Sequence, residues 1–159
     1  MQSAPPKTRR PARTASAPPN PRRCRNVQLQ RGLRVRLVLG RSSVHGLGVF
    51  AAERAARNDF VGEYVGELVT DDEAEIRGKM YDTVSVSYLY DATQTVVVDS
   101  TRLGSRIKFV NHSKEKANLY PRSVRIGGDL RIGLFAKKPL EPGQELFFDY
   151  GYSMEGWRN

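Results

Sequence analysis

Short runs of branched and aromatic residues, separated by turn residues, fill this sequence from residue 35 onward and restrict it to a fold made of small sheets. Such runs are typical of strands, and they occur at 35–40, 59–70, 84–90, 94–100 and 107–110. The run at 59–70 contains two glycines, which predicts a bent strand or a pair of strands. The stretch "VRIGGDLRIGLFA" places Gly-Gly-Asp between two further runs, a strong signal for a hairpin. The pattern therefore predicts a mostly β fold of several small sheets.

One segment carries the signature of a helix instead. Thr70 followed by Glu73 forms a capping box, in which each side chain satisfies a backbone N–H at the start of a helix. Acidic residues follow Thr70 directly and Lys79 lies near the other end, as the helix dipole favours. The spacing predicts a short helix over residues 71–80.

The positive charge of the chain is concentrated at its N-terminus. The chain has a net charge of +9, and residues 1–36 hold ten of its Lys and Arg residues and no acid. Residues 1–33 are rich in Pro, Arg, Ala and Ser, a composition that predicts a disordered basic arm. Such an arm is typical of a nucleic-acid contact or a nuclear address. A solubilising leader, or the edge of an adjacent cysteine-rich domain, explains it equally well.

The rest of the composition excludes several classes of protein. A chain of 159 residues suits one domain. It has no run of about 18 apolar residues, the length that a membrane-spanning helix requires, so no membrane partner is expected. Cys24 is the single cysteine, so no internal disulfide forms and a reducing, intracellular setting is favoured. In that setting the sequon at Asn111 is not expected to be glycosylated.

Three short motifs are candidates for chemistry. Two glycines flank Leu47 in "HGLGVF", and glycine allows backbone to approach a ligand closely. "FVNHS" places Asn111 beside His112 directly after an apolar run, and "FFDYGY" ends the domain with aromatic residues at every second position. Taken singly, each has a structural explanation: an ordinary turn, a core hydrogen-bond network and an aromatic core stripe.

Together, in this order, the motifs resemble the SET domain of protein lysine methyltransferases over residues 34–152, with 153–159 as a short C-terminal tail. The resemblance is closest to the Enhancer of zeste (Polycomb) branch, through "RNVQLQRG", "DEAEIRGKMYD", "VVVDSTRLGSRIKFVNHS", "GDLRIGLFAKKPL" and "GQELFFDYGYS". It implies the β-clip fold of small curved sheets, with one short helix and a C-terminal threaded crossing in which the Asn-His strand is buried.

The resemblance also implies the site. SET enzymes transfer a methyl group from S-adenosyl-L-methionine to a lysine amine, and Tyr150 matches the catalytic tyrosine of the family. The positions that match cofactor-binding residues are Gly46, Leu47, Gly48, Tyr88, Asn111 and His112. The positions that match the lysine channel are Val84, Phe148 and Tyr152. No metal site is expected, because Cys24 lacks partner cysteines.

The implied function is methylation of a histone H3 tail lysine in the A-R-K-S context on the nucleosome, in the nucleus and associated with gene silencing. Polycomb companion subunits, a WD-repeat protein and a zinc-finger scaffold, are the expected partners, and the basic arm is expected to contact DNA. Valine at 84 and phenylalanine at 148, where the family also uses tyrosine, predict a roomy channel and higher methylation states. The alternatives are a methyltransferase for a non-histone protein, and a catalytically silent SET module that binds chromatin.

Overall fold

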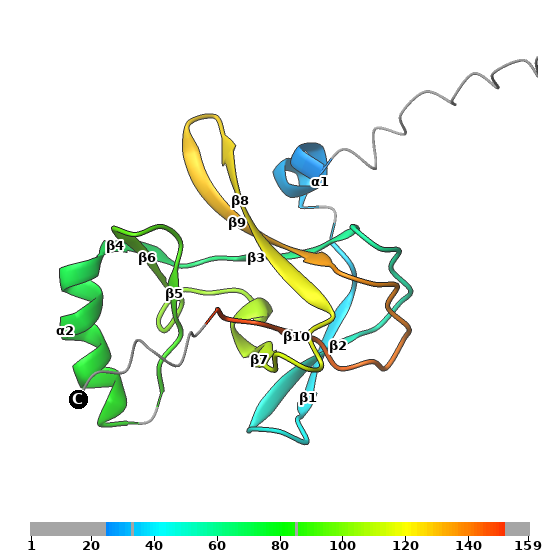
Figure 1. Cartoon of the computed structure of the whole chain (residues 1–159), viewed down its shortest axis with the longest axis horizontal. Coiled ribbons are helices and arrows are strands. Elements are labelled where there is room, and N and C mark those ends of the chain that lie inside the picture. Colours follow the sequence, from blue (N-terminus) through cyan, green and yellow to red (C-terminus); the bar gives the residue numbers. More distant parts are fainter. Residues whose placement is uncertain (1–24, 33, 85, 152–159) are drawn as a thin grey trace, which may run out of the picture.

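The computed structural model describes residues 25–32, 34–84 and 86–151 as four small sheets, two α-helices and a short 3-10 helix (Figure 1). The helices are α1 (Arg25–Arg31), α2 (Asp71–Asp82) and the 3-10 helix η2 (Arg106–Phe109). The strands are β1 (Leu37–Arg41), β2 (Leu47–Ala51), β3 (Phe60–Tyr64), β4 (Glu67–Thr70), β5 (Leu89–Asp91), β6 (Val96–Asp99), β7 (Asn111–His112), β8 (Leu119–Ile126), β9 (Asp129–Ala136) and β10 (Phe147–Phe148). The predicted mostly β fold of small sheets is confirmed.

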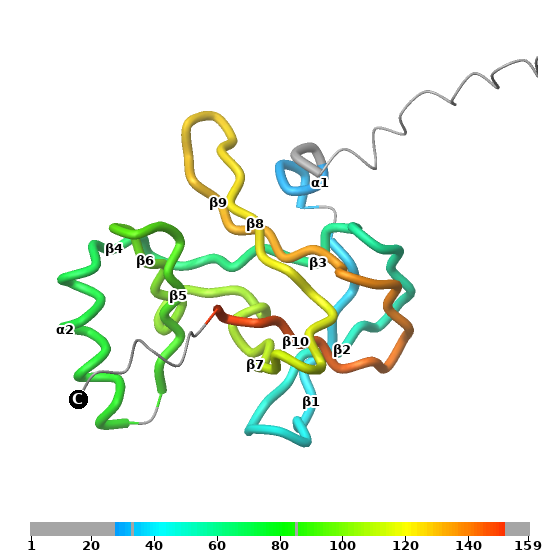
Figure 2. Tube along the Cα trace, viewed as in Figure 1, coloured from blue at the N-terminus to red at the C-terminus, as the bar shows by residue number. Residues whose placement is uncertain are grey.

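The sheets pair segments that are distant in the sequence. Their strand orders are β1-β2, β10-β7, β3-β9-β8 and β4-β6-β5. All pairs are antiparallel except β10 with β7, which run parallel. Figures 1 and 2 show β10 beside β7 in the middle of the molecule, with α2 at one end and the β8–β9 hairpin projecting from the body.

Two local predictions are confirmed. The β8–β9 hairpin closes through Gly127 and Gly128, whose φ angles of 61° and 100° give the left-handed turn that suits the twist of a hairpin. Helix α2 begins at the capping residue Thr70, whose side chain accepts a hydrogen bond of 3.3 Å from the backbone N–H of Glu73. The segment at 59–70 is a pair of strands, β3 and β4.

The strand predicted at 107–110 is wrong, because this segment forms η2. The Ser105 hydroxyl accepts from the Ile107 N–H at 3.2 Å and donates to the Glu63 carbonyl at 2.6 Å, which starts a helical turn. Ile107 is buried against Gly62, where a Cβ atom would lie only 2.7 Å from the Ile107 side chain. The missing side chain of Gly62 therefore leaves the room that the turn needs.

Disorder predicted through residue 33 is also wrong, since α1 forms within that range. Leu29 is 1% exposed and packs with Phe60 and Phe135 in a separate small core. The composition of the arm gives no sign of this single apolar contact, which Phe60 of β3 and Phe135 of β9 provide. Residues 1–24, including Cys24, and the tail at 153–159 lie outside the described residues.

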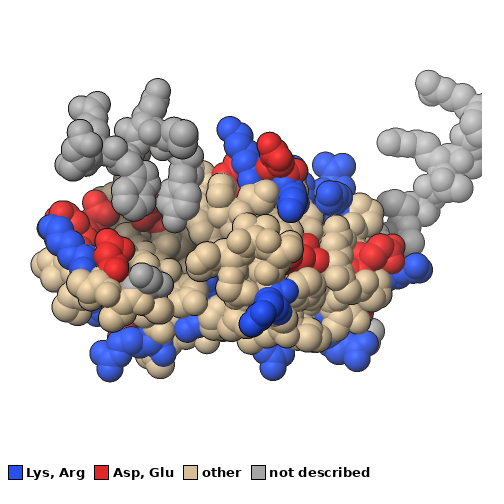
Figure 3. All heavy atoms as spheres, turned by 90° about the horizontal axis from the view of Figure 1, so that it is seen from below, with Lys and Arg blue, Asp and Glu red and all other residues tan. Residues whose placement is uncertain are grey.

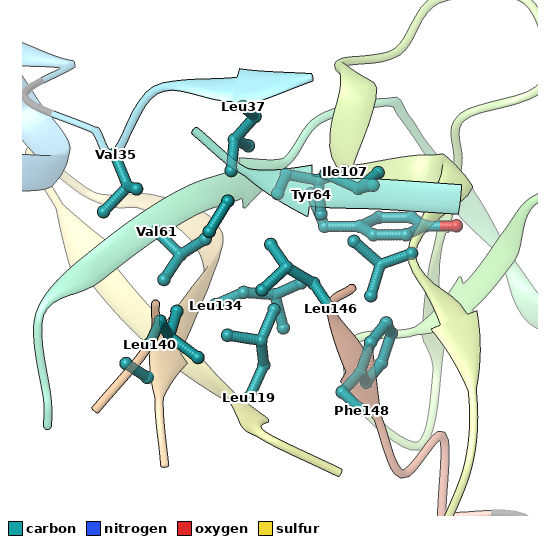
Figure 4. Close-up of a cluster of buried hydrophobic side chains, with 14 of the residues drawn as sticks. Val35, Leu37, Val61, Tyr64, Ile107, Leu119, Leu134, Leu140, Leu146 and Phe148 are labelled. Atoms are coloured by element: carbon teal, nitrogen blue, oxygen red, sulfur yellow. The ribbon is translucent and has the colours of Figure 1, made fainter. Parts of the chain in front are cut away.

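The main core lies between the sheets and reaches the C-terminal strand (Figure 4). Val35 and Leu140 lie at one end of the cluster, and Tyr64 and Phe148 lie at the other. The hydroxyl of Tyr64 points away from the cluster (Figure 4). The core thus ends in two aromatic residues, and the polar group of Tyr64 faces away from it.

A buried carboxylate joins α2 to the sheet that it covers. Asp99 is fully buried and accepts hydrogen bonds from Arg77 at 2.8 Å, from the Tyr81 hydroxyl at 2.7 Å and from the Thr101 N–H at 2.9 Å. Burial alone would raise the pKa of Asp99, but the hydrogen bonds from Arg77, Thr101 and Tyr81 hold it below its ordinary value. Because Ala74 is the one buried residue of α2, this network supplies much of the attachment of the helix.

Replacement of Leu29 tests the docking of α1. Leu29→Ala removes a fully buried side chain and is expected to lower the free energy of unfolding by about 2–5 kcal/mol. Urea denaturation measures the change. Leu103→Ala is the matched control, because Leu103 is 63% exposed, and its effect should stay within about 0.5 kcal/mol. Equal effects of the two substitutions would contradict the docking.

The Asp99 network predicts a pH-dependent stability. A carboxyl group whose pKa is lowered by folding stabilises the protein above its ordinary pKa, and this contribution is lost as the pH falls through the folded pKa. Asp99→Asn is therefore expected to cost about 1.5–3 kcal/mol at neutral pH. The difference from wild type should shrink below about pH 4. Urea denaturation across this pH range measures it, and a difference independent of pH would contradict the prediction.

Candidate active site

The candidate site forms where β7, the loop before β2 and the residues after β10 meet. The parallel pairing of β10 with β7 aligns Phe147 with Asn111 and Phe148 with His112. The backbone of Leu146 also donates to the carbonyl of Val49 in β2 at 2.8 Å. Residues separated by about a hundred positions are therefore fixed side by side.

Asn111 holds the glycine loop in place. Its side-chain amide donates to the carbonyl of His45 at 3.2 Å and to that of Leu47 at 3.0 Å. These bonds bracket Gly46, which has a φ of 48° that disfavours other residues. Gly48 is needed for a different reason: a Cβ atom there would lie 2.5 Å from the carboxylate of Glu145.

Tyr150 is fixed at both its backbone and its hydroxyl. Its N–H donates to His112 Nδ1 at 3.1 Å, and its hydroxyl donates to the carbonyl of Val110 at 2.5 Å. Its ring lies 5.2 Å from the His112 ring and 4.4 Å from the Phe148 ring. Packing on two sides and a bond at each end leave the phenol little freedom to rotate.

The Asn-His pair is not buried as predicted. Asn111 is half-buried, and the His112 side chain is 38% exposed, because β7 borders a cavity. The buried asparagine is Asn118, which is 2% exposed. It donates to the Glu145 carbonyl at 2.7 Å and accepts from the Phe147 N–H at 2.9 Å. The sequence contains no signal that separates the two asparagines, since both follow apolar or turn residues.

A cavity of about 390 Å3 borders β7 and the glycine loop. It is lined by Val44, His45, Gly46, Leu47, Val86, Ser87, Tyr88, Lys108, Phe109, Asn111, His112 and Tyr150. All the predicted cofactor-binding positions except Gly48 are in this lining. The volume falls in the range of roughly 300–1,000 Å3 that small-molecule sites occupy, and the mixture of aromatic rings and backbone polar groups suits a nucleoside-containing ligand.

A small pocket of about 30 Å3 is also lined by Tyr150, and we call it the channel because it contains the predicted channel residue Phe148. Its lining is Tyr64, Leu89, Tyr90, Asp91, Phe148 and Tyr150. The rings of Tyr64 and Tyr90 lie 5.2 Å apart, and the Tyr64 hydroxyl donates to the Tyr88 carbonyl at 3.1 Å. Burial, and then the nearby Asp91 carboxylate, raise the pKa of Tyr90, so its phenol stays neutral near pH 7.

Sequence reasoning missed four channel residues: Tyr64, Leu89, Tyr90 and Asp91. The alternation in "SYLYD" predicts that Tyr88 and Tyr90 share a face of a strand. That pattern would have placed Tyr90 in the same cavity as Tyr88. Instead, the structure places them in different hollows, because regular strand begins only at Leu89.

A third hollow, of about 490 Å3, runs along α2 and also reaches Tyr150. Its charged residues are Asp71, Glu75, Asp82 and Asp91 against Lys79 and Lys108. Lys79 is paired with Glu75 at 2.9 Å. Figure 3 shows acidic and basic side chains together at the α2 end of the molecule. Acidic groups outnumber basic ones along this groove.

One predicted channel position lies elsewhere, and another is not described. Val84 is 64% exposed and is absent from the lining of the channel. Tyr152 lies outside the described residues. A larger cavity of about 720 Å3, lined in part by Arg34, Arg36 and Arg106, contains none of the predicted site residues.

Within residues 25–32, 34–84 and 86–151, no three His, Cys, Asp or Glu side chains gather as a metal site would require. Among the helices described there, none has the length and apolar character that crossing a membrane demands.

The model of the SET-domain family matches residues 46–151, about two thirds of the chain. The chain belongs to the SET-domain family. The predicted fold and family are confirmed.

Similar proteins fall in the Polycomb branch, as the resemblance implied. Over 132 residues this SET domain is 42% identical to the histone-lysine N-methyltransferase MEDEA of Arabidopsis thaliana, covering 83% of this chain and 19% of the relative. It is 41% identical over 129 residues to the histone-lysine N-methyltransferase CLF of Oryza sativa subsp. japonica, covering 81% and 14%.

Solved structures show the same likeness. The crystal structure of the Chaetomium thermophilum polycomb repressive complex 2 matches with a TM-score of 0.75 and 37% identity, over 82% of this chain and 17% of that chain. The complex in an autoinhibited conformation bound to S-adenosylmethionine matches with a TM-score of 0.74 and 36% identity, over 80% and 16%. This SET domain thus spans less than a fifth of the length of these relatives.

Proposed function

We propose that the chain is a protein lysine methyltransferase that uses S-adenosyl-L-methionine. One observation carries the proposal: Tyr150 lines both the cavity of about 390 Å3 and the channel of about 30 Å3. A single rigid phenol at the junction of a cofactor-sized cavity and a narrow aromatic channel suits a transfer between two substrates that enter separately.

The cavity fits the cofactor. Gly46, Leu47, Tyr88, Asn111 and His112 would hold it, through the exposed loop backbone, the tyrosine ring and the two polar side chains. When bound, S-adenosyl-L-methionine supplies an electrophilic methyl group on a positively charged sulfur. The bonds from Asn111 to the glycine loop keep the wall of the cavity ready before the ligand arrives, which lowers the entropy cost of binding.

The channel accounts for activation of the lysine. A free lysine amine has a pKa near 10.4, so only about 1 in 2,500 is neutral at pH 7. A channel walled by Tyr64, Tyr90 and Phe148 removes water from the amine, and desolvation lowers its pKa. Holding the amine in line with its target is worth up to roughly 7–11 kcal/mol. The channel can therefore act by alignment and desolvation.

Tyr150 would position the reacting amine. Its hydroxyl is anchored to the Val110 carbonyl, so its oxygen occupies one fixed place at the end of the channel. A fixed hydroxyl and nearby backbone carbonyls stabilise charge that develops at the nitrogen without the cost of reorganisation. Tyr152 would complete the channel, as the resemblance implies.

The favoured substrate is a histone H3 tail lysine in the A-R-K-S context. The acidic groove along α2 attracts a basic peptide, and it reaches the same tyrosine as the channel. The relatives are named histone-lysine N-methyltransferases, and one similar complex was solved with peptides named H3K27me3 and H3K27M. The chain would act in the nucleus and in gene silencing, with residues 34–152 as its SET domain.

Companion subunits would support this activity. The similar structures are polycomb repressive complexes, in which the matching chain is about six times as long as the part that matches. A WD-repeat protein and a zinc-finger scaffold are the proposed partners, and the arm at 1–33 would contact nucleosomal DNA through phosphates.

Tyr150→Phe tests the proposed catalytic role. Loss of the hydroxyl is expected to lower methyl transfer by about 100-fold or more while cofactor binding is retained. Transfer of radiolabelled methyl to nucleosomes and to free H3, with and without Polycomb companions, measures it. Tyr120→Phe is the matched control, since the Tyr120 hydroxyl contacts Asn58 away from the site. Transfer by Tyr150→Phe at the wild-type rate, or none by wild type under either condition, would refute the proposal.

Phe148→Tyr tests the predicted bias toward higher methylation states. The bias rests on the missing hydroxyl of Phe148 alone, because Val84 lies outside the channel lining. An added hydroxyl would occupy space in a channel of only about 30 Å3 and hold a water or the amine by a hydrogen bond. We expect the main product to shift from di- and trimethyl-lysine to monomethyl-lysine. Mass spectrometry of the peptide products measures the shift. A wild type that makes only monomethyl-lysine would show that the channel is not roomy.

A further inference from the structure

Lys108 occupies the wall between the two larger hollows of the site. It lies in η2, lines both the cofactor-sized cavity and the groove along α2, and is half-buried. Its ammonium donates to the carbonyl of Ser100 at 3.1 Å and to that of Thr101 at 3.3 Å. It also lies 5.0 Å from the ring centre of Tyr88 and 5.3 Å from that of Phe109. The resemblance to SET enzymes gave no role to this residue.

The two carbonyls belong to the segment that holds Tyr88. The Ser100 N–H donates to the Tyr88 carbonyl at 2.9 Å, and the Tyr88 N–H donates to the Thr101 hydroxyl at 3.4 Å. Ser100 is fully buried. Lys108 therefore ties η2, which leads directly into β7, to the backbone that carries a wall of the cofactor-sized cavity.

The aromatic part of that wall depends on the same ammonium. The rings of Tyr88 and Phe109 meet edge to face, 5.4 Å apart and at 77°. Lys108 contacts both rings within the distance at which a cation attracts an aromatic face. Val86, two residues before Tyr88, is 43% exposed and therefore adds little buried packing next to it.

The small size of Gly104 is a second observation that supports the placement of the Lys108 side chain. A Cβ atom at Gly104 would lie 2.7 Å from the Ser100 carbonyl oxygen and 3.1 Å from Cδ of Lys108. Gly104 is absent from the positive-φ residues, so its backbone conformation does not require glycine. The small residue instead leaves room for the lysine side chain to reach the two carbonyls.

We infer that Lys108 is a positioning residue that fixes the Tyr88–Phe109 wall and thereby sets the affinity for the adenosyl cofactor. The inference rests on the proposed function, and Lys108 acts through Tyr88 and Phe109. The role requires a cation with at least two donors, which arginine can also supply. Methionine keeps the length and apolar character of the stem but removes the charge and the donors.

Calorimetric titration of the full chain with S-adenosylhomocysteine tests the effect on affinity. Lys108→Met is expected to raise Kd about tenfold or more, the effect of losing one or two hydrogen bonds to a charged donor. Lys108→Arg should stay within about threefold of wild type. Lys116→Met is the matched control, because Lys116 lies 5.7 Å from the ring centre of Phe147, outside the cavity lining, and should leave Kd unchanged.

Amide hydrogen exchange without ligand gives a second readout. Lys108→Met, and Gly104→Ala through its steric clash, should each accelerate exchange of the Ser100 amide relative to wild type and Lys116→Met. Unchanged Ser100 exchange in Lys108→Met, or equal Kd changes in Lys108→Met and Lys116→Met, would overturn the inference. A wild-type chain that fails to bind the probe while Lys108→Met still accelerates exchange would refute the proposed function and leave the bracing role of Lys108 supported.

Discussion

The parallel pairing of β7 with β10 is the contact on which the site depends. Parallel strands need a long connection, and here the connection contains the whole β8–β9 hairpin. The pair has only two residues in each strand, so the ladder alone is weak. Its stability comes from Phe148, which is 1% exposed, and from Asn118, whose amide bonds both to Glu145 and to Phe147. The core thus holds the last strand in place, and the last strand places Tyr150.

Glycine determines how closely the pieces of this site can approach one another. Gly48 lies against the Glu145 carboxylate and Gly62 against Ile107, and in both places a single methyl group would collide. The first contact brings the glycine loop to the C-terminal strand, and the second lets η2 turn toward β7. Tight packing of this kind transmits small changes, because protein interiors leave few voids to absorb them. A larger residue at either glycine would therefore disturb the site by pushing the two contacting segments apart.

Local signals in the sequence were sufficient for α2 and for the β8–β9 hairpin. A capping box and a Gly-Gly turn act within a few residues, so neighbouring residues decide the outcome. The errors have a common cause in long-range packing. Residues 107–110 have the composition of a strand but form a helical turn because Gly62, 45 positions earlier, makes room. Leu29 is ordered by Phe60 and Phe135, which no local pattern reveals. Five of the six cofactor-binding positions that the resemblance implied line the cavity of about 390 Å3, but the family motifs gave no indication of Lys108 or Asp91.

The groove along α2 and the channel favour different protonation states of a substrate lysine. A carboxylate favours the ammonium form, and two unit charges 4 Å apart attract by about 4 kcal/mol at an effective dielectric constant of 20. Exclusion of water from the channel would favour the neutral amine, because desolvation disfavours the charged form. Asp91 lines both hollows, yet it is exposed to solvent, which weakens its Coulombic pull. An exposed carboxylate at the mouth can guide a cation inward without fixing its charge, whereas a buried one would hold the proton on the amine. The separation of a wet, acidic groove from a dry, aromatic channel is therefore a physical requirement of the proposed chemistry.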